Sequence, residues 1–421
     1  MTRQFQSDIS SFFIVIKNAT IIDGTGADPV PNGFVVIENE RIKEVGSGGS
    51  GSTPSNALAV DCRGQSLLPG LIDAHVHLGA VDANIIEQQR QYFSSLLVVK
   101  TLKIMNQTLD QGFTTVRDAG GADPGLRAAV DQGLVPGPRL FVCGPPLSQT
   151  GGHADFRLPT EMAPAVRSAA GLASWVCDGV DEVRRAARDL LRQGVDHIKV
   201  MAGGGAMSPS DEIDTSQYSL DELKAIVFEA ESAGTYVMSH CYSDRSILNS
   251  IATGVRSIEH GNLLTEKSAV AMRDAGAFLV PTIVTYEMIA RMGKDLGIPE
   301  NNVRKINIAR EKALDALETA YRTGVKIASG SDLLGPMQIY KAMELELKAR
   351  VLGPMGALVA ATKTNAELLR RENDLGTIEA GKLADMIVVD GDPLTNIDVL
   401  QQYQEKISLI MKGGWIYKNK L

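Results

Sequence analysis

The sequence lacks long runs of any one kind of residue. The longest apolar stretch near its start, residues 12–16, falls far short of the roughly 18 residues that a membrane-spanning helix needs. Lys and Arg number 42 and Asp and Glu number 50, which gives a net charge of −8. No block of like charge is long enough to form a tail. This acidic, evenly mixed chain excludes a basic surface for nucleic acid or for an anionic membrane.

Cysteine is scarce, with only Cys62, Cys143, Cys177 and Cys241, and no CxxC pair occurs. That scarcity excludes a disulfide framework and a thiolate zinc site. No signal-peptide pattern precedes the first apolar run. We therefore expect a soluble, cytoplasmic protein, although a leader removed ahead of the first residue would leave no trace in this sequence.

Both ends of the chain are rich in strand-like segments, whereas the middle is not. Its 421 residues suffice for two to three domains of about 150 residues, or for one large barrel with an appendage. Short apolar or alternating runs bounded by turn residues occur at 12–22, 33–45, 384–394 and 407–419. Between the ends, eight short apolar runs alternate with helical stretches, at 67–77, 113–120, 139–144, 197–202, 236–242, 257–261, 278–283 and 325–332.

The alternation predicts parallel strands connected by helices. One helix is expected over residues 180–194, closed by Gly194, and another over 219–234, where Ser219 and Glu222 form a capping-box pattern. Eight repeats in about 300 residues favour a (β/α)8 TIM barrel over a doubly wound sheet. We predict an α/β fold, with the barrel at 66–370 and a small β-sandwich domain built from 1–65 and 371–421.

Five of the six histidines follow an apolar strand-like run or end one. His75 and His77 form an HxH pattern on the first strand, so both side chains face the same way and can reach one metal ion. An HxH pair alone is equally consistent with two polar residues at a strand end. Position favours the metal: His240, His260 and Asp332 end the fifth, sixth and eighth strands, where the active sites of barrels assemble.

Lys199 is the lysine of the apolar fourth strand, HIKVMA. A cation beside metal ions is electrostatically unfavourable, but burial and a nearby metal lower the pKa of a lysine. A neutral amine can add carbon dioxide to become a carbamate, an anionic ligand able to bridge two metals. A snorkelling or ion-paired lysine is the alternative, since lysine is seldom buried alone.

These residues carry a resemblance that spans nearly the whole chain. HVH at 75–77, Lys199, His240, His260 and Asp332, with the phrases LLPGLIDAHVH, SIEHGN, GSDLLG and GTIEAGKLADMIVVDGDPL, resemble the amidohydrolase superfamily. FTTVRDAGGA, SQTGGHAD, PTIVTY and SGSDLLG are similar to its prolidase-like, metal-dependent carboxypeptidase branch, which includes ochratoxin amidases. That branch cleaves dipeptides and N-acyl amino acids.

The resemblance implies a binuclear metal site. His75 and His77 would bind the more buried ion, His240 and His260 the second, carboxylated Lys199 would bridge them, and Asp332 would complete the first site. Nitrogen and oxygen ligands without thiolate point to two zinc ions, although manganese, cobalt or iron could substitute. Two divalent ions lower the pKa of a shared water to give hydroxide, and one polarises the amide carbonyl. Asp332 would carry the proton to the departing amine.

Two further residues are expected in the site from the resemblance. His153, in a glycine-rich loop, would help hold the carbonyl oxygen, with an exposed loop histidine as the alternative. Tyr242, two residues after His240, would bind substrate, with rim packing as the alternative. Arg117 could hold a substrate carboxylate or form an ion pair with Asp118 or a neighbouring strand, and His197 is expected in the barrel core.

The expected function is hydrolysis of the amide bond of a dipeptide or N-acyl amino acid, including ochratoxin A-type amides, that carries a free carboxylate. Residues 145–180 are expected to wall an apolar acyl pocket with Leu158, Met162, Trp175 and Val176. A heterocycle deaminase or cyclic-amide hydrolase on the same barrel is the alternative, as is a scaffold without activity. The family resemblance also implies a homo-oligomer.

Overall fold

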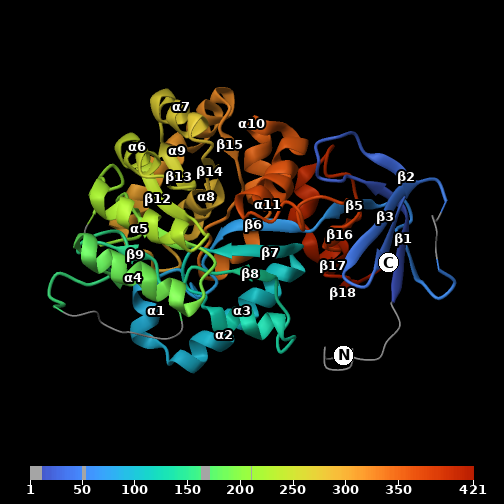
Figure 1. Ribbon diagram of the computed structural model, residues 1–421, viewed down its shortest axis with the longest axis horizontal. Helices are drawn as coiled ribbons and strands as arrows, with labels where there is room; N and C mark the ends of the chain where they lie inside the picture. Colours follow the sequence, from blue (N-terminus) through green and yellow to red (C-terminus); the bar gives the residue numbers. More distant parts are fainter. Residues whose placement is uncertain (1–11, 50–53, 163–170, 210) are drawn as a thin grey trace.

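The computed structural model describes residues 12–49, 54–162, 171–209 and 211–421. Figure 1 shows a larger lobe of strands and helices and a smaller lobe of strands from both ends of the described chain. In the larger lobe, parallel strands form a seven-stranded sheet of order β10-β9-β11-β12-β13-β14-β15 and a three-stranded sheet of order β6-β7-β8. Their bounds are β6 (Leu71–Val76), β7 (Phe113–Asp118), β8 (Arg139–Phe141), β9 (Leu147–Ser148), β10 (Trp175–Val176), β11 (Ile198–Met201), β12 (Val237–Ser243), β13 (Ser257–Leu263), β14 (Phe278–Val280) and β15 (Lys326–Ile327).

Each of the eight predicted strand segments overlaps one of these strands, although β12 and β13 extend past the predicted ends. Backbone hydrogen bonds join the two sheets beside β6: Ala74 N donates to Ser329 O, and Asp332 N donates to His75 O, both over 2.8 Å. On the other side, Asp196 N donates to Val142 O over 2.8 Å. The carboxyl ends of the parallel strands therefore gather on one side of the lobe, where the predicted site residues lie.

Helices surround the strands of the larger lobe (Figure 1). They are α1 (Ile85–Gln91), α2 (Ser94–Asp110), α3 (Pro124–Asp131), α4 (Gly179–Gln193), α5 (Leu220–Ser232), α6 (Asp244–Ala252), α7 (Glu266–Asp274), α8 (Ile283–Met292), α9 (Glu300–Thr323), α10 (Met343–Val359, interrupted at Gly353) and α11 (Asn365–Leu368), with short helical turns η2 (Gly335–Tyr340) and η3 (Ala360–Thr364). None of the helices in the described ranges is long and apolar enough to cross a membrane.

Both helices predicted from end signals are present. α4 ends at Gly194, which adopts the left-handed conformation with φ of 85° that glycine reaches without steric cost. α5 begins at Ser219, whose side chain and that of Glu222 form the reciprocal capping box. The apolar stripe of α4, including Val183 and Leu190, is fully buried, and each such side chain stabilises the fold by about 2 kcal/mol.

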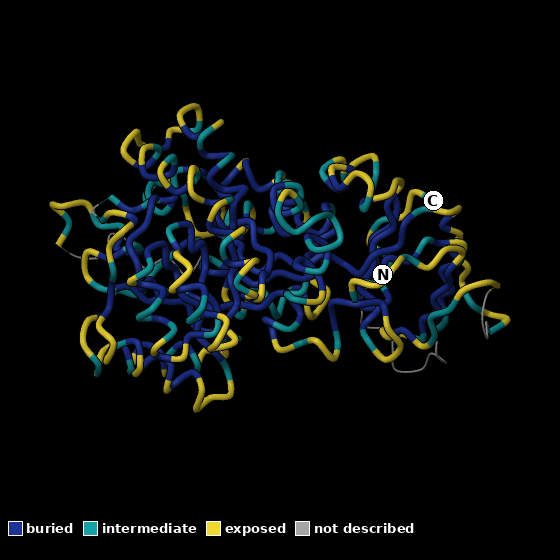
Figure 2. The backbone as a smooth tube through the Cα atoms, turned by 90° about the horizontal axis from the view of Figure 1, so that it is seen from above, coloured by how far each residue is buried: buried dark blue, intermediate teal, exposed yellow. Residues whose placement is uncertain are grey.

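The smaller lobe is one eight-stranded sheet of order β18-β17-β16-β5-β1-β2-β3, with β4 also paired to β1. Its strands are β1 (Phe13–Ile21), β2 (Val30–Glu38), β3 (Arg41–Ser47), β4 (Leu58–Asp61), β5 (Ser66–Pro69), β16 (Met386–Val389), β17 (Ile407–Lys412) and β18 (Trp415–Asn419), and η4 (Ile397–Gln401) and α12 (Tyr403–Lys406) lie between β16 and β17. Apolar side chains of β1, β2, β16 and β17 pack into one buried cluster, and Figure 2 shows buried backbone through both lobes.

The prediction of a single strand over residues 67–77 is wrong at its first residues. β5 belongs to the smaller lobe, where Leu68 lies opposite Ile387 of β16, and β6 starts only after Gly70. A Cβ atom on Gly70 would lie 2.1 Å from Oγ1 of Thr114, so the chain passes between the lobes through a point that admits only glycine. The uninterrupted apolar run concealed this change of sheet.

Candidate active site

A cavity with about 640 Å³ of empty space opens at the carboxyl ends of β6, β11, β12 and β13. Polar side chains line one part of it and apolar side chains line the rest. All eight site residues expected from the sequence line this cavity: His75, His77, His153, Lys199, His240, Tyr242, His260 and Asp332. Its apolar wall includes Ile85, Phe156, Leu172, Met207, Ile289, Ile306 and Leu334.

His75 and His77 face the carboxylate of Asp332. Oδ1 of Asp332 lies 3.5 Å from Nε2 of His75 and 3.2 Å from Nε2 of His77. The two imidazoles share a face because they are two residues apart on an extended segment. Asp332 has a positive φ of 53° and is held by its backbone hydrogen bond to His75. Ends of two distant strands therefore meet at one carboxylate.

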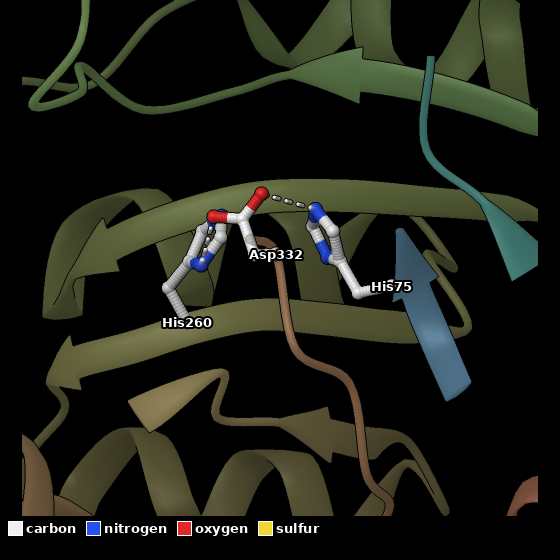
Figure 3. A group of neighbouring side chains, drawn as sticks. All are labelled: His75, His260 and Asp332. Carbon is white, nitrogen blue, oxygen red and sulfur yellow. Dashed lines mark ion pairs between the residues drawn. The ribbon is translucent and has the colours of Figure 1, made fainter. Parts of the chain in front are cut away.

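His260 reaches the same place through an unusual backbone. Its φ is 74°, a left-handed value that is uncommon for residues other than glycine and that clusters at functional sites. The preceding Glu259 points into the interior of the larger lobe, where it contacts His75 and Arg117. Strict alternation of side chains along the strand would therefore turn His260 toward the helices. Donor atoms of His75, His260 and Asp332 lie within 4.8 Å of one another, and Figure 3 shows the three side chains converging.

Acceptors on the far side of the rings fix which nitrogen faces the cavity. Nδ1 of His75 lies 2.7 Å from a carboxylate oxygen of Glu259, and Nδ1 of His77 lies 2.8 Å from Gly120 O. Nε2 of His240 lies 3.1 Å from Gly204 O. Because carbonyl and carboxylate oxygens only accept, these nitrogens carry the protons. The opposite nitrogens of His75 and His240 keep free lone pairs, and Nε2 of His75 is buried without a hydrogen-bond partner among the described residues.

Lys199 on β11 is 1% exposed and lines the cavity. Nothing in the described part of the chain forms a hydrogen bond or ion pair with its amine, so the ion-paired alternative is not observed. Burial lowers the pKa of Lys199, which favours the neutral amine that carbamate formation requires. The neighbouring strand brings His240 close, since Met201 of β11 lies opposite His240 of β12.

Burial also governs the charge of the imidazoles and of Asp332. It lowers the pKa values of His75, His240 and His260, the last to about 3. Burial alone would raise the pKa of Asp332, but its histidine neighbours lower it overall. For His77, the carboxylate of Asp332 overcomes burial and raises the pKa. At neutral pH His75, His240 and His260 are thus neutral imidazoles beside an anionic carboxylate, which is the protonation state that metal binding needs.

Arg117 does not face the cavity. It is fully buried and donates to both carboxylate oxygens of Glu259, at 2.8 and 3.0 Å, and to Ser257 Oγ at 2.9 Å. The prediction of an ion pair with Asp118 or with a neighbouring strand names the wrong partner, because Glu259 lies on β13 and β7 pairs only with β6 and β8 among the described strands. His197 is buried in the core as expected, with Nε2 3.1 Å from Asp118 O.

His153 and Tyr242 both lie in the cavity wall. The ring of His153 stacks on that of His240, with centroids 4.1 Å apart, and its Nδ1 lies 3.0 Å from Ser208 Oγ. The ring of Tyr242 stacks on that of His260 at 5.2 Å. Neither residue is therefore an exposed loop or rim side chain.

The predicted lining of the acyl pocket is wrong. Leu158 and Met162 are exposed, and neither they nor Trp175 and Val176 line the cavity. Pro146, Ala154, Phe156 and Leu172 of the same segment do so instead. Apolar content located the segment correctly, but it did not distinguish side chains that face inward from those that face solvent. Residues 163–170 of this segment lie outside the described ranges.

Four imidazoles, a carboxylate and a buried lysine around one cavity match the nitrogen and oxygen donors that zinc prefers. The unpartnered Nε2 of His75 and the free lone pairs of its neighbours fit such an ion. This chemistry is typical of metal-assisted hydrolases built at the carboxyl ends of strands.

Comparison with known proteins narrows the class. The amidohydrolase family model matches residues 66–416. The ochratoxinase of Aspergillus niger is 31% identical over 430 residues, which cover 96% of this chain and 86% of that protein. A prolidase solved with N-methylphosphonate-L-proline is 41% identical with a TM-score of 0.93, covering 97% of this chain and 100% of that one. A Xaa-Pro dipeptidase solved with methionine in its active site is 30% identical with a TM-score of 0.88, over the same shares.

The chain therefore belongs to the amidohydrolase family. It is a hydrolase of carbon–nitrogen bonds, of the ochratoxinase and prolidase type. The resemblance to the prolidase-like branch is confirmed.

Proposed function

We propose that this protein is a binuclear-metal amidohydrolase that cleaves the amide bond of dipeptides or N-acyl amino acids, ochratoxin A-type amides among them. The observation that carries the proposal is the convergence of His75, His77, His240, His260, Lys199 and Asp332 on one cavity. We infer that the larger lobe is a closed (β/α)8 barrel, that the single sheet of the smaller lobe folds over on itself as a β-sandwich, and that the protein works in the cytoplasm as a homo-oligomer.

The ligands divide into two sets. His75, His77 and Asp332 would hold one ion, and His240 and His260 would hold the second. Lys199, carboxylated on Nζ, would bridge them, because its buried amine has no competing partner among the described residues and burial lowers its pKa. Zinc suits these donors. Bound metal ions would supply an acidified water and a Lewis acid for the amide carbonyl.

The chain's own residues perform the remaining steps. Asp332 accepts a proton from the attacking water and delivers it to the departing amine, which could not leave as an anion. His153 and Tyr242 bind and orient the carbonyl oxygen. The apolar wall around Phe156, Leu172 and Ile289 excludes water and binds an apolar acyl group.

The substrate class rests on the cavity together with the relatives. One relative is an ochratoxinase, and others are prolidases or a Xaa-Pro dipeptidase. The name of the Xaa-Pro dipeptidase describes cleavage of a dipeptide, and the apolar wall favours bulky or aromatic acyl halves over small polar ones. A free carboxylate on the amine half is part of this proposal.

A substrate panel run beside two variants at Lys199 tests the proposal. Metal-loaded protein would be incubated with N-acyl amino acids, Xaa-Pro dipeptides, cyclic amides and heterocyclic amines, with products identified by mass spectrometry. We expect amide cleavage of N-acyl amino acids or dipeptides and about two metal ions per chain. Lys199→Ala should lose bound metal and at least about 100-fold in turnover, in line with the loss of a metal-site group.

Lys199→Arg is the matched control, because arginine keeps the length and charge but cannot form a carbamate. It should be as inactive as Lys199→Ala. Ammonia release from heterocycles without amide cleavage would instead establish the deaminase alternative. A folded protein without bound metal would contradict the proposal and favour an inactive scaffold.

A further inference from the structure

Tyr286, at the start of α8, contacts the site without a role in the proposed chemistry. It is fully buried and lines the cavity. Its hydroxyl donates a hydrogen bond to the hydroxyl of Tyr242 over 3.1 Å. The two rings meet edge to face, with centroids 6.1 Å apart.

Tyr242 is enclosed on its other sides by the imidazoles. Its ring stacks on His260 with a centroid distance of 5.2 Å and an interplanar angle of 17°, and meets the edge of His240 at 5.0 Å. Tyr286 also packs edge-on against His260 at 6.4 Å. The phenol of Tyr242 therefore cannot swing without displacing two imidazoles.

A phenol hydroxyl has one proton to donate and can accept hydrogen bonds as well. Because Tyr286 uses its proton on Tyr242, the hydroxyl of Tyr242 is an acceptor in that contact and its own proton remains available. No other partner of the Tyr242 hydroxyl occurs in the described part of the chain, so this proton faces the cavity. A hydroxyl that already accepts a hydrogen bond is also polarised into a stronger donor.

The backbone at the start of α8 supports this arrangement. Thr282, the residue before the helix, has φ of 47° and ψ of 44°, which is a strained conformation for a β-branched residue. Its hydroxyl lies 2.8 Å from Nδ1 of His260. The strained residue thus joins α8 to His260, and the next turn of the helix carries Tyr286 to Tyr242.

We propose that Tyr286 is a positioning residue that orients the hydroxyl of Tyr242 as a hydrogen-bond donor to the carbonyl oxygen of the substrate. This inference rests on the proposed amide hydrolysis. Tyr286 acts through Tyr242 and does not touch the reacting atoms.

Kinetics of Tyr286→Phe, Tyr242→Phe and the double variant test the coupling. Removal of one donor to a developing oxyanion costs about 100-fold in kcat, so we expect Tyr242→Phe to lose about that factor. Tyr286→Phe should lower kcat by about 10-fold with little change in KM, since it weakens a donor and leaves the pocket intact. In the Tyr242→Phe background, Tyr286→Phe should change kcat by less than about twofold, because coupled residues are not additive.

Tyr218→Phe is the matched control, since Tyr218 is a buried tyrosine whose hydroxyl donates to Cys177 O outside the cavity. Its effect should be equal in both backgrounds. Independent, multiplicative effects of Tyr286→Phe and Tyr242→Phe would overturn the inference, as would full kcat in Tyr286→Phe.

A second readout does not depend on turnover. A 3-fluorotyrosine placed at position 242 reports the hydrogen bonding of that hydroxyl by ¹⁹F NMR. Its resonance should shift in Tyr286→Phe and stay unchanged in Tyr218→Phe. An unchanged resonance in Tyr286→Phe would overturn the inference whatever the protein hydrolyses, whereas failure of the wild-type chain to cleave any amide would overturn the proposed function.

Discussion

Glu259 holds His75 from behind: its Oε2 lies 2.7 Å from Nδ1 of the imidazole, and both side chains are at most 1% exposed. The same carboxylate receives Arg117. A buried cation is thereby balanced, and the ring is fixed with its free nitrogen toward the cavity. Partners of this kind set the tautomer and basicity of metal-ligating histidines.

Glu259→Gln should weaken metal binding by about 10- to 100-fold, because the carboxylate that orients His75 is lost. The substitution also leaves Arg117 without its counter-ion, which should lower the free energy of unfolding by about 3–5 kcal/mol. Metal titration and urea denaturation measure the two effects. Ser257→Ala is the control, since Ser257 contacts Arg117 and Glu259 and not His75. This variant should lose stability but keep its metal affinity. Equal metal affinity in Glu259→Gln and the wild type would contradict this role.

Ser208→Ala should lower kcat/KM by about 10-fold and leave the metal content unchanged. Ser208 Oγ donates to the carboxylate of Asp211 and lies 3.0 Å from Nδ1 of His153, so it orients the neutral imidazole through a hydrogen bond of about 0.5–1.5 kcal/mol. Steady-state kinetics with metal analysis are the measurement. Ser250→Ala should keep full kcat/KM, because Ser250 is a buried serine of α6 that contacts Ser239 and Cys241 of β12 and does not line the cavity. Loss of metal in Ser208→Ala would mean that the loop supports the ligands instead.

The metal-free protein should become less stable as the pH falls below about 6.5. Burial lowers the pKa of five histidines. The pKa falls to about 4 for His153 and about 3 for His260, and it lies well below the usual value for His75, His197 and His240. A histidine with a lowered folded-state pKa takes up its proton on unfolding, so its stabilisation is present above 6.5 and is lost toward its folded-state pKa. Each contributes about 1.4 kcal/mol per pH unit in that window.

His77, whose pKa is raised by Asp332 against the effect of burial, offsets part of this slope. Urea denaturation of metal-free protein at pH 7.5 and 5.5 measures the change. His197→Gln should reduce the slope by about one proton, since His197 lies outside the cavity lining. Equal stability at both pH values would show that the imidazoles are not buried in their neutral form.

Phe156→Ala should raise KM for aromatic acyl substrates by about 10-fold or more and leave small acyl substrates nearly unchanged. The ring lies in the apolar wall of the cavity, and truncation of such a contact removes about 1–3 kcal/mol of binding. Leu158→Ala and Met162→Ala are the controls, because both side chains are exposed and lie outside the wall. A larger effect in either control would mean that substrate binds across the outer surface of this segment.

Local patterns in the sequence were sufficient to predict the strands that bring the histidines to the cavity. Alternation of side chains along a strand puts His75 with His77 and His240 with Tyr242, and both pairs lie in the cavity. The expectation that barrel active sites assemble at the carboxyl ends of the strands located Lys199 and Asp332. These features depend on spacing within a few residues, and such spacing can be read without knowledge of the fold.

Features that depend on contacts between distant segments could not be predicted in this way. The pairing of Arg117 with Glu259 crosses the interior of the larger lobe. Because side chains alternate along a strand, an inward-facing Glu259 implies an outward-facing His260, and only the left-handed backbone of His260 turns its imidazole toward the cavity. Ser208 and Tyr286 act only through His153 and Tyr242. The phrase PTIVTY contained Tyr286, but nothing in its spacing distinguished that side chain from ordinary core packing.

Gly70 links a strand of the smaller lobe directly to the strand that carries His75. Among the described residues, those that line the cavity all lie from His75 to Leu334, so the described part of the smaller lobe supplies no side chain to it. Yet β5 is clamped between β1 and β16, and one residue later the same chain becomes β6. His75, on β6, and His77, directly after it, thus follow a strand whose start is fixed in the sheet of the smaller lobe. The orientation of both imidazoles therefore depends on a lobe outside the one that holds the cavity.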